Sequence, residues 1–152
     1  GKQRTEGYID GLHMNGLEYN EDLVLKIGEL GDSEAEQRNL ENRINQVFEK
    51  HPDIDGIFGV NEIYAVTALN VARLRGLQVP EQLSVIGFSD GILSKYARPH
   101  LTTISQHGVQ IGELAAQTLI NRLEIEEKTA FTTQLVKTEL IVRDSTKNTT
   151  KD

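Results

Sequence analysis

The chain has 152 residues, of which 38% are hydrophobic and 26% charged, as expected for one globular domain with a buried core. Its formal net charge of −7 argues against binding nucleic acid or an acidic membrane through a broad basic surface, because phosphate binding needs clustered lysines and arginines. The chain contains no cysteine, which excludes disulfides, thiolate zinc sites and cysteine nucleophiles and is compatible with a cytoplasmic protein.

In the first half of the chain, apolar spacing predicts helices and strands in alternation. Residues 2–15 place apolar side chains on one helical face, and 23–30 are expected to form a strand. A helix over 34–50 follows a polar turn. Residues 55–60 are nearly all apolar, which is typical of a strand covered on both faces. A helix over 61–75 should come next, because Asn61 can cap its first turn.

The second half continues the alternation, beginning with a buried strand over 83–88. A long loop or short helix is expected over 89–100, followed by a strand over 101–105. Apolar residues recur at helical spacing over 107–124 and predict a strongly amphipathic helix. Residues 134–143 alternate in polarity like one or two strands.

This order of elements predicts an α/β fold, with a three-layer, mostly parallel sheet and helices on both faces. No internal repeat or interdomain linker divides residues 1–146, so they are interpreted as one unit followed by a polar tail over 147–152. Open sheets of this kind bind ligands just beyond the carboxyl ends of their parallel strands. Asn61 follows one predicted strand directly, and Ser89 follows another.

The usual catalytic patterns are missing from the sequence, which predicts that the protein is not an enzyme. There is no Gly-x-Ser-x-Gly elbow, no phosphate-binding glycine loop with a lysine, and no His-Glu-x-x-His pair. Glu62 and Asp90 follow neighbouring strands and could form a carboxylate pair, although capping and turn formation explain both more simply. His107 could face a pocket, but a role at the start of a helix is favoured. No metal or other cofactor is expected.

Separated stretches of the chain carry recognisable motifs in a fixed order: Arg4–Tyr8, Val60–Leu69, Val79–Asp90, Pro99–Gln106 and Glu139–Thr146. In this order they resemble the LacI/GalR family of bacterial transcriptional regulators. That resemblance implies a periplasmic-binding-protein-like core of two α/β subdomains with a small-molecule effector, a sugar or a related compound, between them. It identifies residues 1–146 as the second subdomain with its closing strands, and places DNA binding in an amino-terminal helix-turn-helix domain that this chain lacks.

The resemblance nominates Arg4, Asn61, Ser89 and Asp90 as effector-binding residues. Arg4 would clamp ligand hydroxyls or a carboxylate, the alternative being a solvated arginine at a helix start. Asn61 would bind the ligand through its amide, a role compatible with helix capping. Ser89 would reach the ligand or only form a turn, and Asp90 would orient Ser89.

Three residues depart from the family pattern: Glu62 for Asp, Thr67 for Gly and Ser89 for Asp. Serine both donates and accepts hydrogen bonds but carries no charge, so the pocket should be less acidic at that point. This favours a ligand other than a standard monosaccharide.

The resemblance also implies a cytoplasmic homodimer, and Ile92, Leu93 and Tyr96 are unusually apolar for a loop that would contribute to its interface. Alternatively, these side chains fold back on the domain. A second functional interpretation stays open on the sequence alone, because a periplasmic sugar-binding protein that serves transport would have a similar fold.

Overall fold

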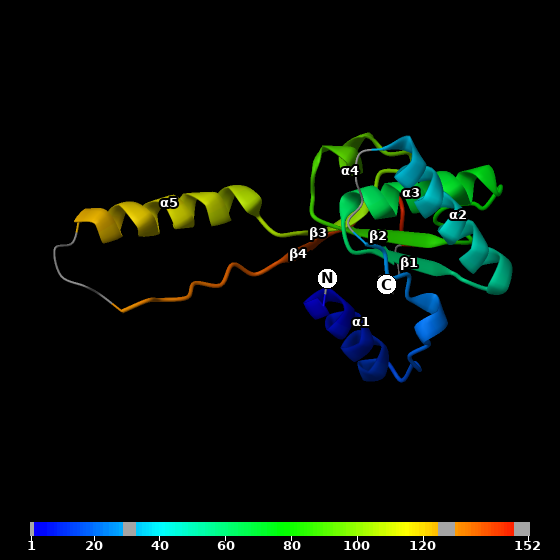
Figure 1. The fold of residues 1–152 in the computed structure, drawn as a ribbon, viewed down its shortest axis with the longest axis horizontal. Coiled ribbons are helices and arrows are strands. Elements are labelled where there is room, and N and C mark those ends of the chain that lie inside the picture. The colour runs from blue at the N-terminus through cyan, green and yellow to red at the C-terminus, as the bar shows by residue number, and fades with distance from the viewer. Residues whose placement is uncertain (1, 29–32, 125–129, 148–152) are drawn as a thin grey trace, which may run out of the picture.

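A computed structural model describes residues 2–28, 33–124 and 130–147 (Figure 1). The elements follow in the order α1 (Lys2–Met14), η1 (Glu21–Leu23, a 3-10 helix), α2 (Glu34–Lys50), β1 (Gly56–Gly59), α3 (Glu62–Leu74), β2 (Ser84–Phe88), α4 (Ile92–Tyr96), β3 (Thr102–Ser105), α5 (Gly108–Glu124) and β4 (Glu139–Ile141). None of the described helices is long and apolar enough to cross a membrane.

The sheet has four strands in the order β1-β2-β3-β4, and its first three strands are parallel. Gly59 pairs with Gly87, and Phe88 pairs with Ile104, so the carboxyl ends of the parallel strands lie at one edge. The fourth strand runs antiparallel to β3. This arrangement confirms the predicted mostly parallel α/β sheet.

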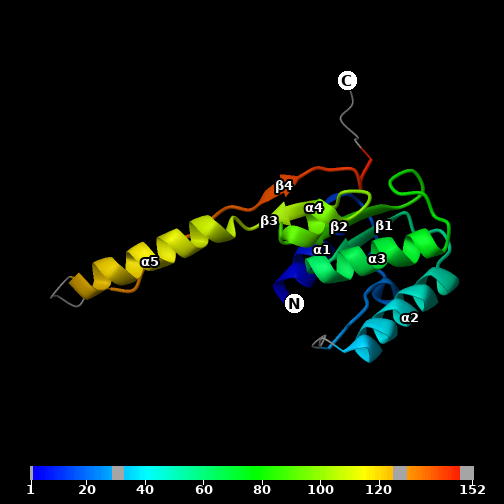
Figure 2. The same ribbon diagram turned by 90° about the horizontal axis from the view of Figure 1, so that it is seen from above.

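Helix α3 packs on one face of the sheet, against β1 and β2, and α2 packs against α3 on the same side (Figures 1 and 2). The strand β2 turns Val85 and Gly87 toward this face, while Ser84, Ile86 and Phe88 remain partly exposed on the other. The buried apolar residues are Leu40, Ile44, Phe48, Ala65, Ala68, Leu69, Val71, Ala72, Leu83, Val85 and Leu101. Helix α1 lies at the opposite face, where the Arg4 guanidinium carbon is 3.9 Å from the centroid of the Phe88 ring.

Local signals in the sequence explain where the covering helices begin. The Ser33 hydroxyl accepts from the backbone N–H of Glu36, and the Glu36 carboxylate accepts from Ser33 in return, which completes a capping box for α2. Asn61 Oδ1 accepts from the backbone N–H of Tyr64 at 2.9 Å and caps α3. The predicted bounds of both helices are therefore confirmed to within a residue or two.

The strand predicted over 23–30 is wrong for its described part. Leu23 closes η1, and residues 24–28 have no regular secondary structure, while residues 29 and 30 lie outside the described part of the chain. Leu25 and Ile27 still pack against the core, with Lys26 exposed between them. Apolar and polar side chains thus alternate between the core and the solvent in this segment, but a strand also needs a hydrogen-bonded neighbour.

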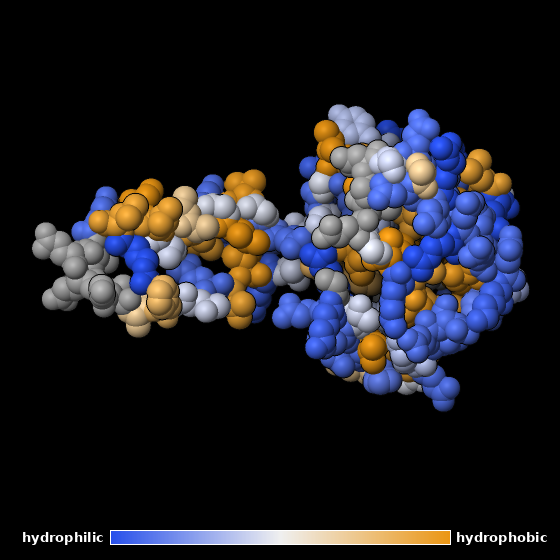
Figure 3. Space-filling model, in the orientation of Figure 1, coloured by the Kyte–Doolittle hydropathy of each residue, from blue (hydrophilic) through white to orange (hydrophobic). Residues whose placement is uncertain are grey.

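The last third of the chain also departs from the predicted packing. Helix α5 forms as predicted but buries none of its residues, and it projects away from the sheet beside the returning segment 130–138 (Figures 1 and 2). Only Glu139–Ile141 of the predicted strand region 134–143 is a strand. Apolar side chains therefore gather along this arm (Figure 3), among them Val109 and Leu123, which are 79% and 78% exposed.

Candidate ligand-binding site

Polar side chains from three strand ends meet at the carboxyl edge of the sheet. Asn61 follows β1, Ser89 follows β2 and Gln106 follows β3. The Ser89 backbone N–H donates to the Ile104 carbonyl at 3.0 Å, and Gln106 Nε2 donates to Ser89 Oγ at 2.7 Å. Since the three strands are parallel and in register, this edge is where ligands of open α/β sheets bind.

Arg4 reaches this edge from α1. Its guanidinium donates to the carbonyl of Val60, the residue before Asn61, and lies over the ring of Phe88, the residue before Ser89. The cation–π contact and the hydrogen bond hold the side chain across the ends of β1 and β2. The structure therefore places Arg4 against the residues that directly precede Asn61 and Ser89. That these three residues bind an effector stays a prediction.

Ser89 has an unusual backbone conformation for a residue with a side chain. Its φ is +79°, in the left-handed region that favours glycine. Its N–H and its hydroxyl are both held by residues at the end of the neighbouring strand β3. Non-glycine residues in this region are concentrated at functional sites, where the surrounding contacts hold them in place.

Asp90 points away from this group of donors and into the protein. Its Oδ1 accepts from Thr103 Oγ1 at 2.8 Å, from Ser94 Oγ at 3.2 Å and from Arg143 at 2.7 Å. Burial raises the pKa of Asp90, but the hydrogen bonds from Thr103 and Arg143 and the charge of Arg143 outweigh it, so the pKa lies below its ordinary value. Asp90 thus ties the end of β2 to β3 and to the segment after β4.

Glu62 is also engaged in the fold. Its Oε1 accepts from the backbone N–H of Ser94 at 2.6 Å, and its carboxylate lies so close to Gly91 that a Cβ there would come within 2.3 Å of it. Glu62 and Asp90 therefore both anchor α4 at Ser94. Glu62 binds the Ser94 backbone N–H, and Asp90 binds the Ser94 hydroxyl. The interpretation of these residues as cap and turn formers fits these contacts, whereas an acid/base pair does not.

His107 precedes α5 with φ +51°, and its carbonyl accepts from the Ile111 N–H in the first turn of the helix. Its Nε2 lies 3.5 Å from Glu139 Oε2, so its ring faces β4. The role at a helix start that the sequence favoured agrees with this position. Among the described residues, no group of His, Asp and Glu side chains could hold a metal ion.

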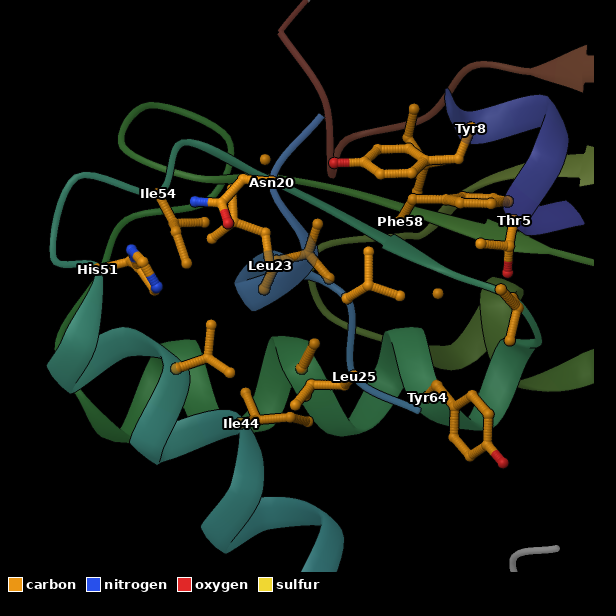
Figure 4. Close-up of a pocket in the computed structure, with 18 of the residues that line it drawn as sticks. Thr5, Tyr8, Asn20, Leu23, Leu25, Ile44, His51, Ile54, Phe58 and Tyr64 are labelled. Carbon is orange, nitrogen blue, oxygen red and sulfur yellow. The ribbon is translucent and has the colours of Figure 1, made fainter. Parts of the chain in front are cut away.

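A hollow of about 900 Å³ opens beside this edge, between the segment 17–27, helix α2 and strand β1. Its lining is mainly apolar, and Figure 4 shows Leu23, Leu25 and Ile44 facing Phe58 across it. Arg4 and Tyr64 belong to its lining, whereas Asn61, Ser89 and Gln106 do not. Arg4 therefore lies between the hollow and the polar groups at the strand ends.

Sequence reasoning missed Gln106 and Arg143 as parts of this region. Both belong to motifs that were recognised, Pro99–Gln106 and Glu139–Thr146, and Gln106 directly follows a predicted strand. That position at a strand end was the available signal for Gln106. Arg143 offered none, because its partner Asp90 lies 53 positions earlier in the chain.

An open, mostly parallel sheet with Arg4, Asn61, Ser89 and Gln106 beyond its parallel strand ends has the architecture of an α/β ligand-binding domain. The profile of the family described as periplasmic binding protein-like domain matches residues 1–146. The chain belongs to this family.

Its relatives are transcriptional regulators. The HTH-type transcriptional regulator CelR of Thermobifida fusca is 30% identical over 145 residues, which span 95% of this chain and 41% of CelR. A solved CelR–cellobiose complex has a TM-score of 0.80 and 29% identity, covering 93% of this chain and 41% of that one. A LacI-type transcription regulator from Bifidobacterium animalis has a TM-score of 0.82 and 27% identity, covering 95% and 49%.

These relatives confirm the predicted homology to LacI-type regulators, and they are regulators rather than enzymes or transport proteins. The chain spans 41% of the length of CelR. The activity, ligands and partners of a complete protein are therefore matters of proposal.

Proposed function

We propose that residues 1–146 form the second subdomain of the effector-binding core of a LacI-type transcriptional regulator. The effector is a small molecule, a sugar or a related compound, bound against Arg4, Asn61 and Ser89. The observation that carries this proposal is the convergence of these three residues at the carboxyl edge of a sheet in a chain of this family. The complex of the relative CelR with cellobiose supports the choice of ligand class.

Asp90 has a different role in this proposal from the other three residues. Its Oδ1 accepts from Thr103, Ser94 and Arg143, so in this proposal Asp90 supports the turn that carries Ser89 rather than meeting the ligand. This agrees with the expectation that Asp90 orients Ser89. It replaces the direct effector contact that the motif alone suggested.

The proposed mechanism is binding coupled to a conformational switch. A second subdomain would close over the edge of the sheet, and effector between the two would favour one relative orientation by its difference in affinity for the two states. Helix α5 supports this arrangement, because its exposed apolar residues need a covering surface. The chain crosses between the body and the α5 arm near Ser105 and Glu139, so these crossings would act as hinges.

DNA binding would reside in an amino-terminal helix-turn-helix domain, consistent with the net charge of −7 of this chain. Regulators of this kind act where the DNA is, so we place the protein in the cytoplasm, with no membrane partner. No cofactor takes part, and no enzymatic step is proposed. The transport alternative is not favoured, because CelR and the relative from Bifidobacterium animalis are both regulators.

A homodimer completes the proposal. Ile92 and Tyr96 on α4 are 68% and 74% exposed, and Ile63 is exposed on α3, the helix that α4 contacts. Exposed apolar side chains on neighbouring helices suit a subunit interface. The molar mass measured by light scattering at micromolar concentration tests this part.

The effector site is tested by Arg4→Ala in the intact regulator, with Arg38→Ala as a matched control on the exposed surface of α2. A thermal-shift screen of neutral and charged sugars first identifies a stabilising ligand. Losing a charge-assisted hydrogen bond to that ligand should weaken binding roughly 10- to 100-fold in calorimetry. Unchanged affinity in Arg4→Ala, or an equal loss in Arg38→Ala, would contradict the proposed site.

A further inference from the structure

Two groups from neighbouring strand ends hold the Arg4 side chain. Its guanidinium donates to the Val60 carbonyl after β1, and the guanidinium carbon lies 3.9 Å from the centroid of the Phe88 ring at the end of β2. In the described part of the chain, no carboxylate lies within ion-pair distance of Arg4. The position of this arginine therefore depends on one carbonyl group and one aromatic ring.

The Phe88 ring is attached to a fixed part of the fold. Phe88 pairs with Ile104 of β3, and the next residue, Ser89, donates its backbone N–H to the Ile104 carbonyl. Arg4, in contrast, belongs to α1, a helix that buries none of its residues. A ring held by the sheet thus positions a long side chain from a helix that is less firmly packed.

The contact with Phe88 leaves Arg4 able to bind a ligand. A cation–π contact uses the flat face of a guanidinium group, whereas the N–H groups point outward in its plane. One N–H group on Nη1 donates to the Val60 carbonyl, which leaves the other N–H groups for a ligand. Phe88 therefore orients the guanidinium without competing for its donors.

From this we infer that Phe88 is a positioning residue of the effector site, which acts through Arg4 rather than through a contact with the effector. The inference rests on the proposed function and deepens it, because it names what prepares Arg4 for binding. An arginine side chain that moves freely loses rotamer freedom when it binds a ligand, and one that is already held loses less. Removing the ring should therefore weaken effector binding roughly 2- to 10-fold.

Chemical labelling of the intact regulator tests the position of Arg4 without an effector. Phenylglyoxal modifies accessible guanidinium groups, and peptide mass spectrometry follows the reaction at Arg4 and at Arg38, which is exposed on α2. Phe88→Leu should raise the rate at Arg4 relative to Arg38 by about 2-fold or more, because the guanidinium loses its aromatic partner. Phe88→Tyr keeps the ring face and should retain the wild-type ratio. An unchanged ratio in Phe88→Leu would overturn the positioning role.

Phe48→Leu is a matched control, because Phe48 also lies against an arginine. The Arg75 guanidinium carbon is 5.4 Å from the centroid of the Phe48 ring, and Phe48 belongs to the apolar core. This substitution should lower the free energy of unfolding and leave the labelling ratio of Arg4 to Arg38 unchanged. An equal rise of that ratio in Phe48→Leu and Phe88→Leu would indicate general loosening of the fold and would overturn a specific role for Phe88.

A double-mutant cycle connects the position of Arg4 to binding, with calorimetry on the intact regulator and the neutral disaccharide cellobiose as the probe. Phe88→Leu should weaken cellobiose binding roughly 2- to 10-fold when Arg4 is present. It should have no further effect in the Arg4→Ala background, since the two residues act as a unit. An equal loss in both backgrounds would show that Phe88 does not act through Arg4.

The outcomes also separate this inference from the proposed function. If Arg4→Ala weakens cellobiose binding and Phe88→Leu does not, the inference fails and the proposed site stands. If Arg4→Ala binds cellobiose as tightly as the wild type, the proposed site is contradicted. If the wild type does not bind cellobiose, this sugar is not the effector, and the labelling ratio decides whether Phe88 holds Arg4.

Discussion

Gly59, the last residue of β1, allows helix α3 to approach the sheet. A Cβ built at Gly59 would lie 2.6 Å from the backbone nitrogen of Ala65 and 2.8 Å from its Cβ. The obstructing atoms belong to the first turns of α3, so Gly59→Ala would force the helix away from the strand. Gly56, at the other end of the same strand, has nothing within 4 Å of its corresponding position.

The two substitutions therefore form a matched pair in one strand. Overpacking against backbone should destabilise Gly59→Ala by about 1–3 kcal/mol. Gly56→Ala should be neutral or stabilising by up to about 1 kcal/mol, because alanine restricts the unfolded chain at a position with free space. For a chain of this length, a loss of 1 kcal/mol lowers the melting temperature by about 2–4 °C.

Urea unfolding of both variants, followed by circular dichroism, measures the difference directly. Gly59→Ala should shift the midpoint to lower urea, with little change in slope. It should also weaken effector binding, because Val60 and Asn61 follow Gly59 and would move with it. Equal stability of the two variants would refute the close packing of α3 on β1.

The remaining predictions concern Asp90 and the dimer. Because the folded pKa of Asp90 is lowered, its ionised form contributes stability that is present above the unfolded value of about 3.9 and is lost as the pH falls through the folded pKa. In Asp90→Asn, the free energy of unfolding should therefore fall less steeply as the pH is lowered into the acid range, as measured by urea unfolding across a pH series. The same acid dependence in the variant as in the wild type would disprove this. Tyr96→Asp should convert the dimer to a monomer in light scattering, because it places a charge in the apolar surface of α4; a dimer that persists, or a wild-type monomer, would contradict the interface.

Much of the fold was predictable because the relevant signals are local. Nearly continuous apolar runs predicted β1 and β2, a polar turn preceded the helix α2, and Asn61 marked the start of α3. The strand expected over 23–30 shows where such signals end. Leu25 and Ile27 do face the core, but strand pairing depends on a neighbouring edge that the segment itself does not encode.

The amphipathic pattern of α5 likewise predicted the element but not its packing partner. The sequence predicted a helix with one apolar face, and the helix formed over Gly108–Glu124. The pattern does not say which surface covers that face, and in the described part of the chain the face stays exposed. Periodicity determines the shape of an element, whereas its partner is decided by the rest of the tertiary structure.

In the candidate site, too, the sequence determined some features and the tertiary structure decided others. The sequence alone determined that Asn61 and Ser89 follow parallel strands, that Ser89 replaces an acidic residue of the family pattern, and that the chain lacks a catalytic motif. Only the tertiary structure decided that Asp90 turns inward to Arg143 and that Gln106 donates to Ser89. These contacts join residues that are far apart in the chain, so the pairing of β2 with β3 and of β3 with β4 sets which of them meet.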